Sequence, residues 1–215
     1  MFKKLFAAIL TVGVLGFAGT GAAQAQEAAD AFVKRISQEV LETAKTDKDI
    51  QSGNQQKILE VVQAKILPNV DFQRMTSLAA GRYWREATPE QQKRLTEEFR
   101  DLLVYTYAGA IAQIRDQQLE FRPMRNDPAD TDVEVRSQVV QQRGEPIQLN
   151  YRLSKSGNSW KIYDLNVLGA WLVETYKGNF ASEIGKGGMD GLIKTLAERN
   201  KRLATGGIAK PAKPS

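Results

Sequence analysis

The stretch from Ser159 to Phe180 places the strongest constraint on what this chain can fold into. Its first half alternates like a β-strand, with Trp160 and Ile162 on one face and Leu165 and Val167 nearer the other. A strand that is apolar on both faces must be covered on both faces. The sequence therefore predicts packing layers on each side of this strand.

The second half of the same stretch changes period. Gly169 interrupts the alternation, and from Trp171 onward the apolar side chains have helical spacing, through Leu172 and Tyr176 to Phe180. A doubly buried strand is thus predicted to turn directly into a helix that folds back over it.

The N-terminus has the three parts of a secretory signal peptide. Met1–Lys4 is basic, Leu5–Phe17 is apolar, and Ala23-Gln24-Ala25 is a small-residue cleavage site. Thirteen apolar residues are too few to span a bilayer core of ~30 Å, and no cysteine follows that could carry a lipid anchor. We expect a signal peptide over 1–25 and export to the periplasm.

The absence of two residue types excludes several kinds of chemistry. The chain has no cysteine and no histidine, so disulfides, Ser-His-Asp catalysis and the usual zinc or iron sites are excluded. Removal of Lys3 and Lys4 lowers the net charge from +5 to +3. Because the basic residues are scattered, we expect no nucleic-acid partner, no metal and no cofactor.

Helical patterns fill the first half of the mature chain. The best start signal is Thr88-Pro89 with Gln91, a capping box; Ser52 with Gln55 and Asp71 are further candidate caps. The predicted helices cover residues 27–46, 52–67, 71–81 and 88–115.

The second half alternates between strands and turns before it becomes helical again. Strands are predicted over 119–125, 133–139, 147–153 and 160–167, and their short turns predict an antiparallel meander. Glycines at 185, 187 and 188 precede a last helix that begins near Met189.

These patterns together predict an α+β fold, with helices packed on a curved antiparallel sheet that often leaves a pocket at its open end. We expect one domain over 26–204 and a flexible tail over 205–215, which is low in apolar residues.

Several segments resemble the MlaC family, also called the toluene-tolerance family. They lie in the same order over nearly all of the mature chain, at 70–76, 81–91 (GRYWREATPEQ), 160–164 (WKIYD), 169–180 and 190–193. One departure is clear: the family usually has Gly-Val-Ser-Leu and Tyr-Arg where this chain has Gly169-Ala170-Trp171-Leu172 and Tyr176-Lys177. The bulk of Trp171 is expected to narrow or reshape the pocket entrance.

The resemblance implies an NTF2-like fold with a long apolar cavity and the function of a periplasmic phospholipid carrier. Such proteins move lipid between an outer-membrane lipoprotein complex and an inner-membrane ABC transporter, which maintains the lipid asymmetry of the outer membrane. It implies phospholipid as cargo, transient contacts with both complexes, a monomer and no catalytic residues.

A lipid carrier must shield acyl chains from water. A diacyl phospholipid has roughly 30 methylenes, and exposing them costs on the order of 25 kcal/mol. The apolar residues left over after an ordinary core is assigned are the candidate lining. They are Val104, Tyr105, Ala108, Ile111, Val135, Leu149, Tyr151, Leu153, Tyr163, Leu165, Val167, Trp171 and Leu172.

Two other functions compete with lipid carriage. The first is a periplasmic adaptor of an ABC transporter that carries no lipid and whose pocket is collapsed. The second is an NTF2-like enzyme that would use Asp164 as a base beside Tyr163. Adjacent strand residues point to opposite faces, so these two side chains should not serve one pocket, and Asp164 is expected to anchor nearby backbone or an arginine.

Overall fold

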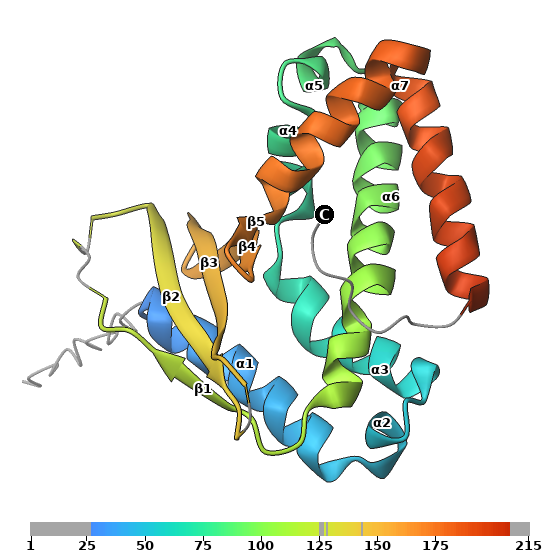
Figure 1. Ribbon diagram of the computed structural model, residues 1–215. Coiled ribbons are helices and arrows are strands. Elements are labelled where there is room, and N and C mark those ends of the chain that lie inside the picture. The colour runs from blue at the N-terminus through green and yellow to red at the C-terminus, as the bar shows by residue number, and fades with distance from the viewer. Residues whose placement is uncertain (1–26, 125–126, 128, 143, 207–215) are drawn as a thin grey trace, which may run out of the picture.

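The computed structural model describes residues 27–206, apart from 125, 126, 128 and 143. The predicted signal peptide and residues 207–215 of the predicted tail lie outside the described residues, whereas Thr205 and Gly206 belong to the last helix. Helices precede and follow a five-stranded sheet, as Figure 1 shows, so the α+β prediction is confirmed. The helices are α1 (Ala29–Thr46), α2 (Lys48–Gln51), α3 (Gln55–Val61), α4 (Phe72–Ala80), α5 (Tyr83–Glu86), α6 (Pro89–Tyr107) and α7 (Leu172–Gly206), with a π-helical turn η1 (Val62–Ile66) and 3-10 turns η2 (Leu67–Asn69) and η3 (Ala108–Gln113).

The sheet is an antiparallel meander in the order β1-β2-β3-β4-β5, as predicted. Its strands are β1 (Gln118–Phe121), β2 (Asp132–Val140), β3 (Ile147–Ser156), β4 (Ser159–Val167) and β5 (Ala170–Trp171). The register shifts once, where Arg152 pairs with Asp164 but Leu153 pairs with Ile162. Tyr163 is the extra residue at this β-bulge, so the side chains of β4 do not alternate strictly between the two faces of the sheet at this point.

Side-chain caps set several helix starts. Thr88 Oγ1 accepts the backbone N–H of Gln91 at 3.2 Å, and the Gln91 side chain accepts the Thr88 N–H at 3.0 Å, which confirms the capping box. Asp71 caps α4 as predicted. The prediction for Ser52 was wrong, because Asp47 first caps the short helix α2, Ser52 ends that helix, and Asn54 caps α3.

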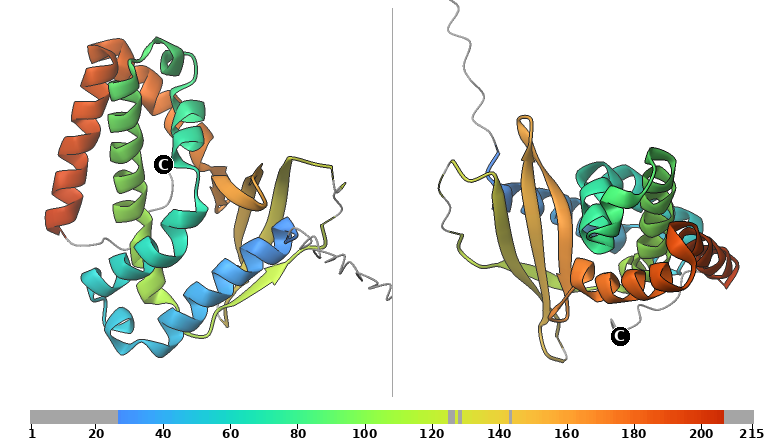
Figure 2. Two further views of the ribbon diagram at one scale, coloured as in Figure 1. Left: turned by 180° about the vertical axis from the view of Figure 1, so that it is seen from behind. Right: turned by 90° about the horizontal axis from the view of Figure 1, so that it is seen from above.

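The predicted helix over 88–115 also ends earlier than expected. α6 stops at Tyr107, and the chain tightens into the 3-10 turn η3 up to Gln113. At the other end of the molecule, α7 bends at Gly187 and Gly188, where the backbone is not helical. This confirms the predicted glycine break, and the left view of Figure 2 shows the two halves of α7 diverging from the bend with α6 between them.

Three hydrophobic clusters hold the described residues together. The helical core joins α4, α6 and α7, and in it the Phe99 ring lies 4.9 Å from Tyr176 and 5.0 Å from Phe180. The α1–sheet core joins Phe32, Val33 and Ile36 of α1 to Val135, Tyr151, Leu153, Trp160 and Ile162 of the sheet. The lower core joins α1, α2, α3, η1 and η3 through Ala44, Ile50, Ile58, Val61, Val62, Ala108 and Ile111.

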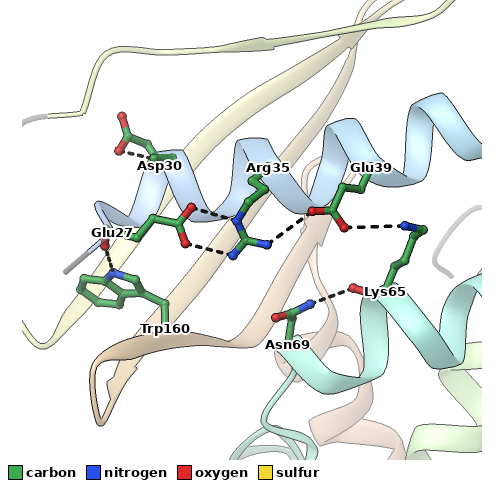
Figure 3. Close-up of polar contacts among 8 residues, drawn as sticks. Glu27, Asp30, Arg35, Glu39, Lys65, Asn69 and Trp160 are labelled. Carbon is green, nitrogen blue, oxygen red and sulfur yellow. Dashed lines mark hydrogen bonds and ion pairs between the residues drawn. The ribbon is translucent and has the colours of Figure 1, made fainter. Parts of the chain in front are cut away.

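Polar contacts also fix α1 on the sheet. The Trp160 indole N–H donates to the backbone oxygen of Glu27 at 2.9 Å, as Figure 3 shows. The Arg35 guanidinium forms a bidentate salt bridge with the Glu27 carboxylate, in which Nε and Nη2 donate to the two oxygens at 3.0 and 2.9 Å. This salt bridge holds the pKa of Glu27 below its ordinary value. Glu39 continues the chain of charges to Lys65 of η1 at 3.7 Å. These groups are partly exposed, so the ion pairs orient α1 more than they stabilise it.

No helix within the described part of the chain is both long and apolar enough to cross a bilayer.

Candidate functional site

The two faces of the sheet differ in chemistry. The face on which α1 packs, here the α1 face, carries Val133, Val135, Ser137 and Val139 of β2 and their cross-strand partners on β3. The opposite face carries Asp132, Glu134, Arg136 and Gln138 of β2. The alternation that the sequence predicted for these strands therefore separates an apolar surface from a polar one.

α1 covers only part of the α1 face. The remaining apolar side chains at this end of the sheet are half-buried, and the register places them beside one another across four strands. We call this set the apolar row. It consists of Leu119 and Phe121 of β1, Val139 of β2, Ile147 and Leu149 of β3, and Val167 of β4.

The structure divides the thirteen predicted lining residues among several places. Val135, Tyr151 and Leu153 belong to the α1–sheet core, Leu172 to the helical core, and Ala108 and Ile111 to the lower core. Val104, Leu149 and Leu165 lie at core margins, and Leu165 touches both the helical core and the α1–sheet core. Tyr105 and Val167 are half-buried. The residues at margins and the half-buried ones leave apolar surface accessible.

Tyr163 and Trp171 lie apart from this group. The Arg74 guanidinium is 3.8 Å from the Tyr163 ring centroid, and that of Arg152 is 3.9 Å from the Trp171 ring. Trp171 pairs with Asn166 on the face opposite α1. Each ring thus makes a cation–π contact on the polar side of the sheet, and the structure does not bring either one to the apolar row.

Asp164 anchors the strand-to-helix turn, as the sequence predicted. It is 1% exposed, accepts the backbone N–H groups of Leu165 at 2.9 Å and Val173 at 3.0 Å, and pairs with Arg152 at 3.3 Å. Burial raises the pKa of this carboxyl, while the hydrogen bonds oppose the rise. The bulge places Asp164 and Tyr163 on one side, which corrects the argument from alternation, but the carboxylate is committed to structural partners.

Tyr151 is a polar group within the α1 face. Burial raises the pKa of its hydroxyl to about 12, and hydrogen bonds with Ser37 and Ser137 partly oppose the rise. Ser137 is itself buried and donates to the backbone oxygen of Leu149 at 2.5 Å. Tyr151 and Ser137 are therefore neutral groups with hydrogen-bond partners, and they place no charge beside the adjoining apolar surface.

Two hollows that the structure presents have a different character. One of about 200 Å³ and one of about 370 Å³ share Arg122 and Arg136, and polar side chains such as Gln138, Gln148 and Glu134 line them. Neither is lined by any of the thirteen predicted residues that the structure describes. The apolar cavity therefore stays a prediction. No group of three or more Asp or Glu side chains within the described residues is placed to hold a metal ion.

Four row residues were missed from the sequence. Leu119, Phe121, Val139 and Ile147 continue the same two-residue alternation as Val135 and Leu149, so the pattern contained the signal. Only the register shows that these side chains lie close together, since Leu119 pairs with Val139 and Val139 with Ile147, while Phe121 pairs with Ser137 beside Leu149.

Comparison with known protein families shows to which family the chain belongs. The sequence profile described as MlaC protein matches residues 34–198. The chain belongs to the MlaC family. That stretch includes α6, the whole sheet and most of α7.

Two relatives are named for phospholipid transport and for toluene tolerance, respectively. The chain is 26% identical over 160 residues to the intermembrane phospholipid transport system binding protein MlaC of Haemophilus influenzae, covering 70% of this chain and 74% of that protein. It is 26% identical over 165 residues to the toluene tolerance protein ttg2D of Pseudomonas putida, covering 76% of each.

A solved structure is also similar to this chain. The phospholipid-binding protein from Ralstonia solanacearum, determined in complex with a phospholipid, matches with a TM-score of 0.77 and 50% identity. The match covers 82% of this chain and 98% of the other.

Proposed function

We propose that this protein carries a phospholipid in its apolar interior, through the periplasm, between an outer-membrane lipoprotein complex and an inner-membrane ABC transporter. The observation that carries the proposal is the apolar row. Six apolar side chains lie side by side on the α1 face yet remain half-buried. The bound phospholipid of the Ralstonia solanacearum relative and the name of the Haemophilus influenzae protein support this function.

The energetics of the row favour an acyl chain as its ligand. A side chain that is left half-buried forfeits part of the free energy of burial, about 25 cal/mol per Å² of apolar surface. An acyl chain lying along Leu149 and Val167 would recover that free energy and would itself be shielded from water. Tyr105 and Val104 of α6 are half-buried apolar residues as well, and Val104 packs against the lower core.

The same arrangement favours transport without catalysis. Asp164, the carboxylate that an enzyme of this fold would need, is held by two backbone N–H groups and Arg152. We further propose that the protein acts as a monomer whose contacts with its donor and acceptor are transient, as a shuttle requires.

Organic extraction of the purified protein tests the proposal directly. We expect mass spectrometry of the extract to find phospholipid in an amount comparable to the protein. A protein prepared from membrane-rich cells that contains no phospholipid would instead support the adaptor function.

Lipid binding should also stabilise the fold. A ligand that binds only the native state at 100 times its Kd adds about 2.7 kcal/mol to the free energy of unfolding. For a chain of this size, the melting temperature should rise by about 5–10 °C on loading. Differential scanning calorimetry of delipidated and reloaded protein measures the difference, and identical melting temperatures would contradict the proposed site.

A further inference from the structure

The turn between β4 and β5 has an unfavourable residue at its first position. It consists of Leu168 and Gly169, whose φ angles are 55° and 89°. Two-residue turns with positive φ at both positions favour asparagine followed by glycine. Leucine is rare in the left-handed region because its Cβ crowds the backbone carbonyl. Leu168 is the one non-glycine residue with positive φ within the described part of the chain.

No local contact explains the choice of leucine. The turn is held by the Leu168 N–H, which donates to the Gln148 oxygen at 3.1 Å, and by the Gly169 N–H, which donates to Asn166 Oδ1 at 3.1 Å. The first is a backbone hydrogen bond that any residue except proline could make. The Leu168 side chain is 48% exposed, so burial does not offset the strained conformation. A residue that is unfavourable in this conformation, and that the turn does not require, indicates a functional constraint.

The position of Leu168 relative to the apolar row indicates what that function is. It directly follows Val167, which belongs to the row. Its backbone hydrogen bond reaches Gln148, which lies between the row residues Ile147 and Leu149. The exposed leucine therefore stands where the apolar row meets solvent.

We infer that Leu168 is the contact over which an acyl chain of the cargo passes between the apolar row and the outside. The inference rests on the proposed function and names a residue that controls the rate of transfer. An acyl chain that leaves the protein must cross from apolar surroundings to an acceptor, and its exposure to water on the way raises the barrier. A leucine side chain at the boundary keeps part of the chain in apolar contact and lowers that barrier.

Leu168→Asn separates this role from a structural one. Asparagine suits the left-handed turn, so the variant should be at least as stable as wild type. It lacks the apolar side chain, so we expect lipid exchange to slow about three- to tenfold. The measurement is the rate at which purified, loaded protein gives a fluorescent phosphatidylglycerol to vesicles of phosphatidylethanolamine and phosphatidylglycerol, with occupancy at equilibrium measured separately.

Two further variants make the comparison specific. Leu168→Met keeps an apolar side chain and should keep the wild-type rate. Leu78→Gln removes the other large exposed apolar side chain of the described residues, which is 41% exposed and lies on α4, and should leave the rate unchanged.

A Leu168→Asn protein that exchanges lipid as fast as wild type overturns the inference while the proposed function stands. Loss of equilibrium occupancy in that variant also overturns it, since Leu168 would then belong to the binding surface. Wild-type protein that holds no lipid removes the proposed function itself.

Discussion

Val167→Arg is expected to remove phospholipid from the protein while the fold is retained. Val167 lies in the apolar row, half-buried, opposite Leu149 of β3. A guanidinium there would have to lose water to accommodate an acyl chain, and burying an unpaired charge costs several kcal/mol. We expect bound lipid to fall about tenfold or more, measured by mass spectrometry of the extracted protein.

A matched variant tests whether charge alone has this effect. Gln148→Arg adds the same group to the neighbouring strand β3, where the side chain is exposed on the face opposite α1. It should bind lipid as wild type does. Circular dichroism of both variants shows whether they are folded. A folded Val167→Arg protein with normal lipid content would mean that the acyl chains lie elsewhere.

Asp164→Ala should destabilise the fold by about 1–3 kcal/mol, the cost typical of leaving a buried hydrogen-bond donor unsatisfied. The substitution leaves the buried N–H of Val173 without its acceptor and deprives Arg152 of its partner. It also removes the link between the end of β4 and the start of α7. Chemical denaturation measures the loss. Arg152→Met, which keeps an aliphatic contact with Trp171, should cost less, because the buried carboxylate keeps its two backbone N–H donors.

The pH dependence of stability gives a second measurement on the same carboxylate. Burial raises the pKa of Asp164 above its ordinary value of 3.8, so the folded state binds this proton more tightly than the unfolded state does. The contribution of Asp164 to stability is therefore largest below pH 3.8 and declines as pH rises from there through the raised folded-state pKa. Asp164→Ala should lack this decline, and a parallel pH profile in the variant would contradict the assignment.

The architecture followed from the sequence wherever one local rule decided the outcome. The capping box at Thr88, the Asp71 cap, the glycine break in α7 and the order of strands needed only nearby residues. The end of α6 did not, because its apolar second half continues past Tyr107 in a tighter turn of similar composition.

The candidate site was harder to predict for a physical reason. The sequence pattern is the same for an apolar side chain that fills a core, as Leu153 does, and for one that lies at its margin, as Leu149 does. Only the placement of α1 decides between the two. Likewise, Tyr163 and Trp171 were expected among apolar neighbours but stack on arginines, because the bulge and the β4–β5 turn set their direction.

The attachment of α1 to the sheet has a consequence for synthesis. The Trp160 indole N–H donates to the backbone oxygen of Glu27, 133 positions earlier in the chain. The apolar stripe of α1 is therefore buried only by strands that are synthesised near the end of translation. At ribosomal speeds of about 5–20 residues per second, that helix waits roughly 7 to 27 s for its partner. Throughout this delay, the apolar stripe of α1 must be kept from associating with other chains.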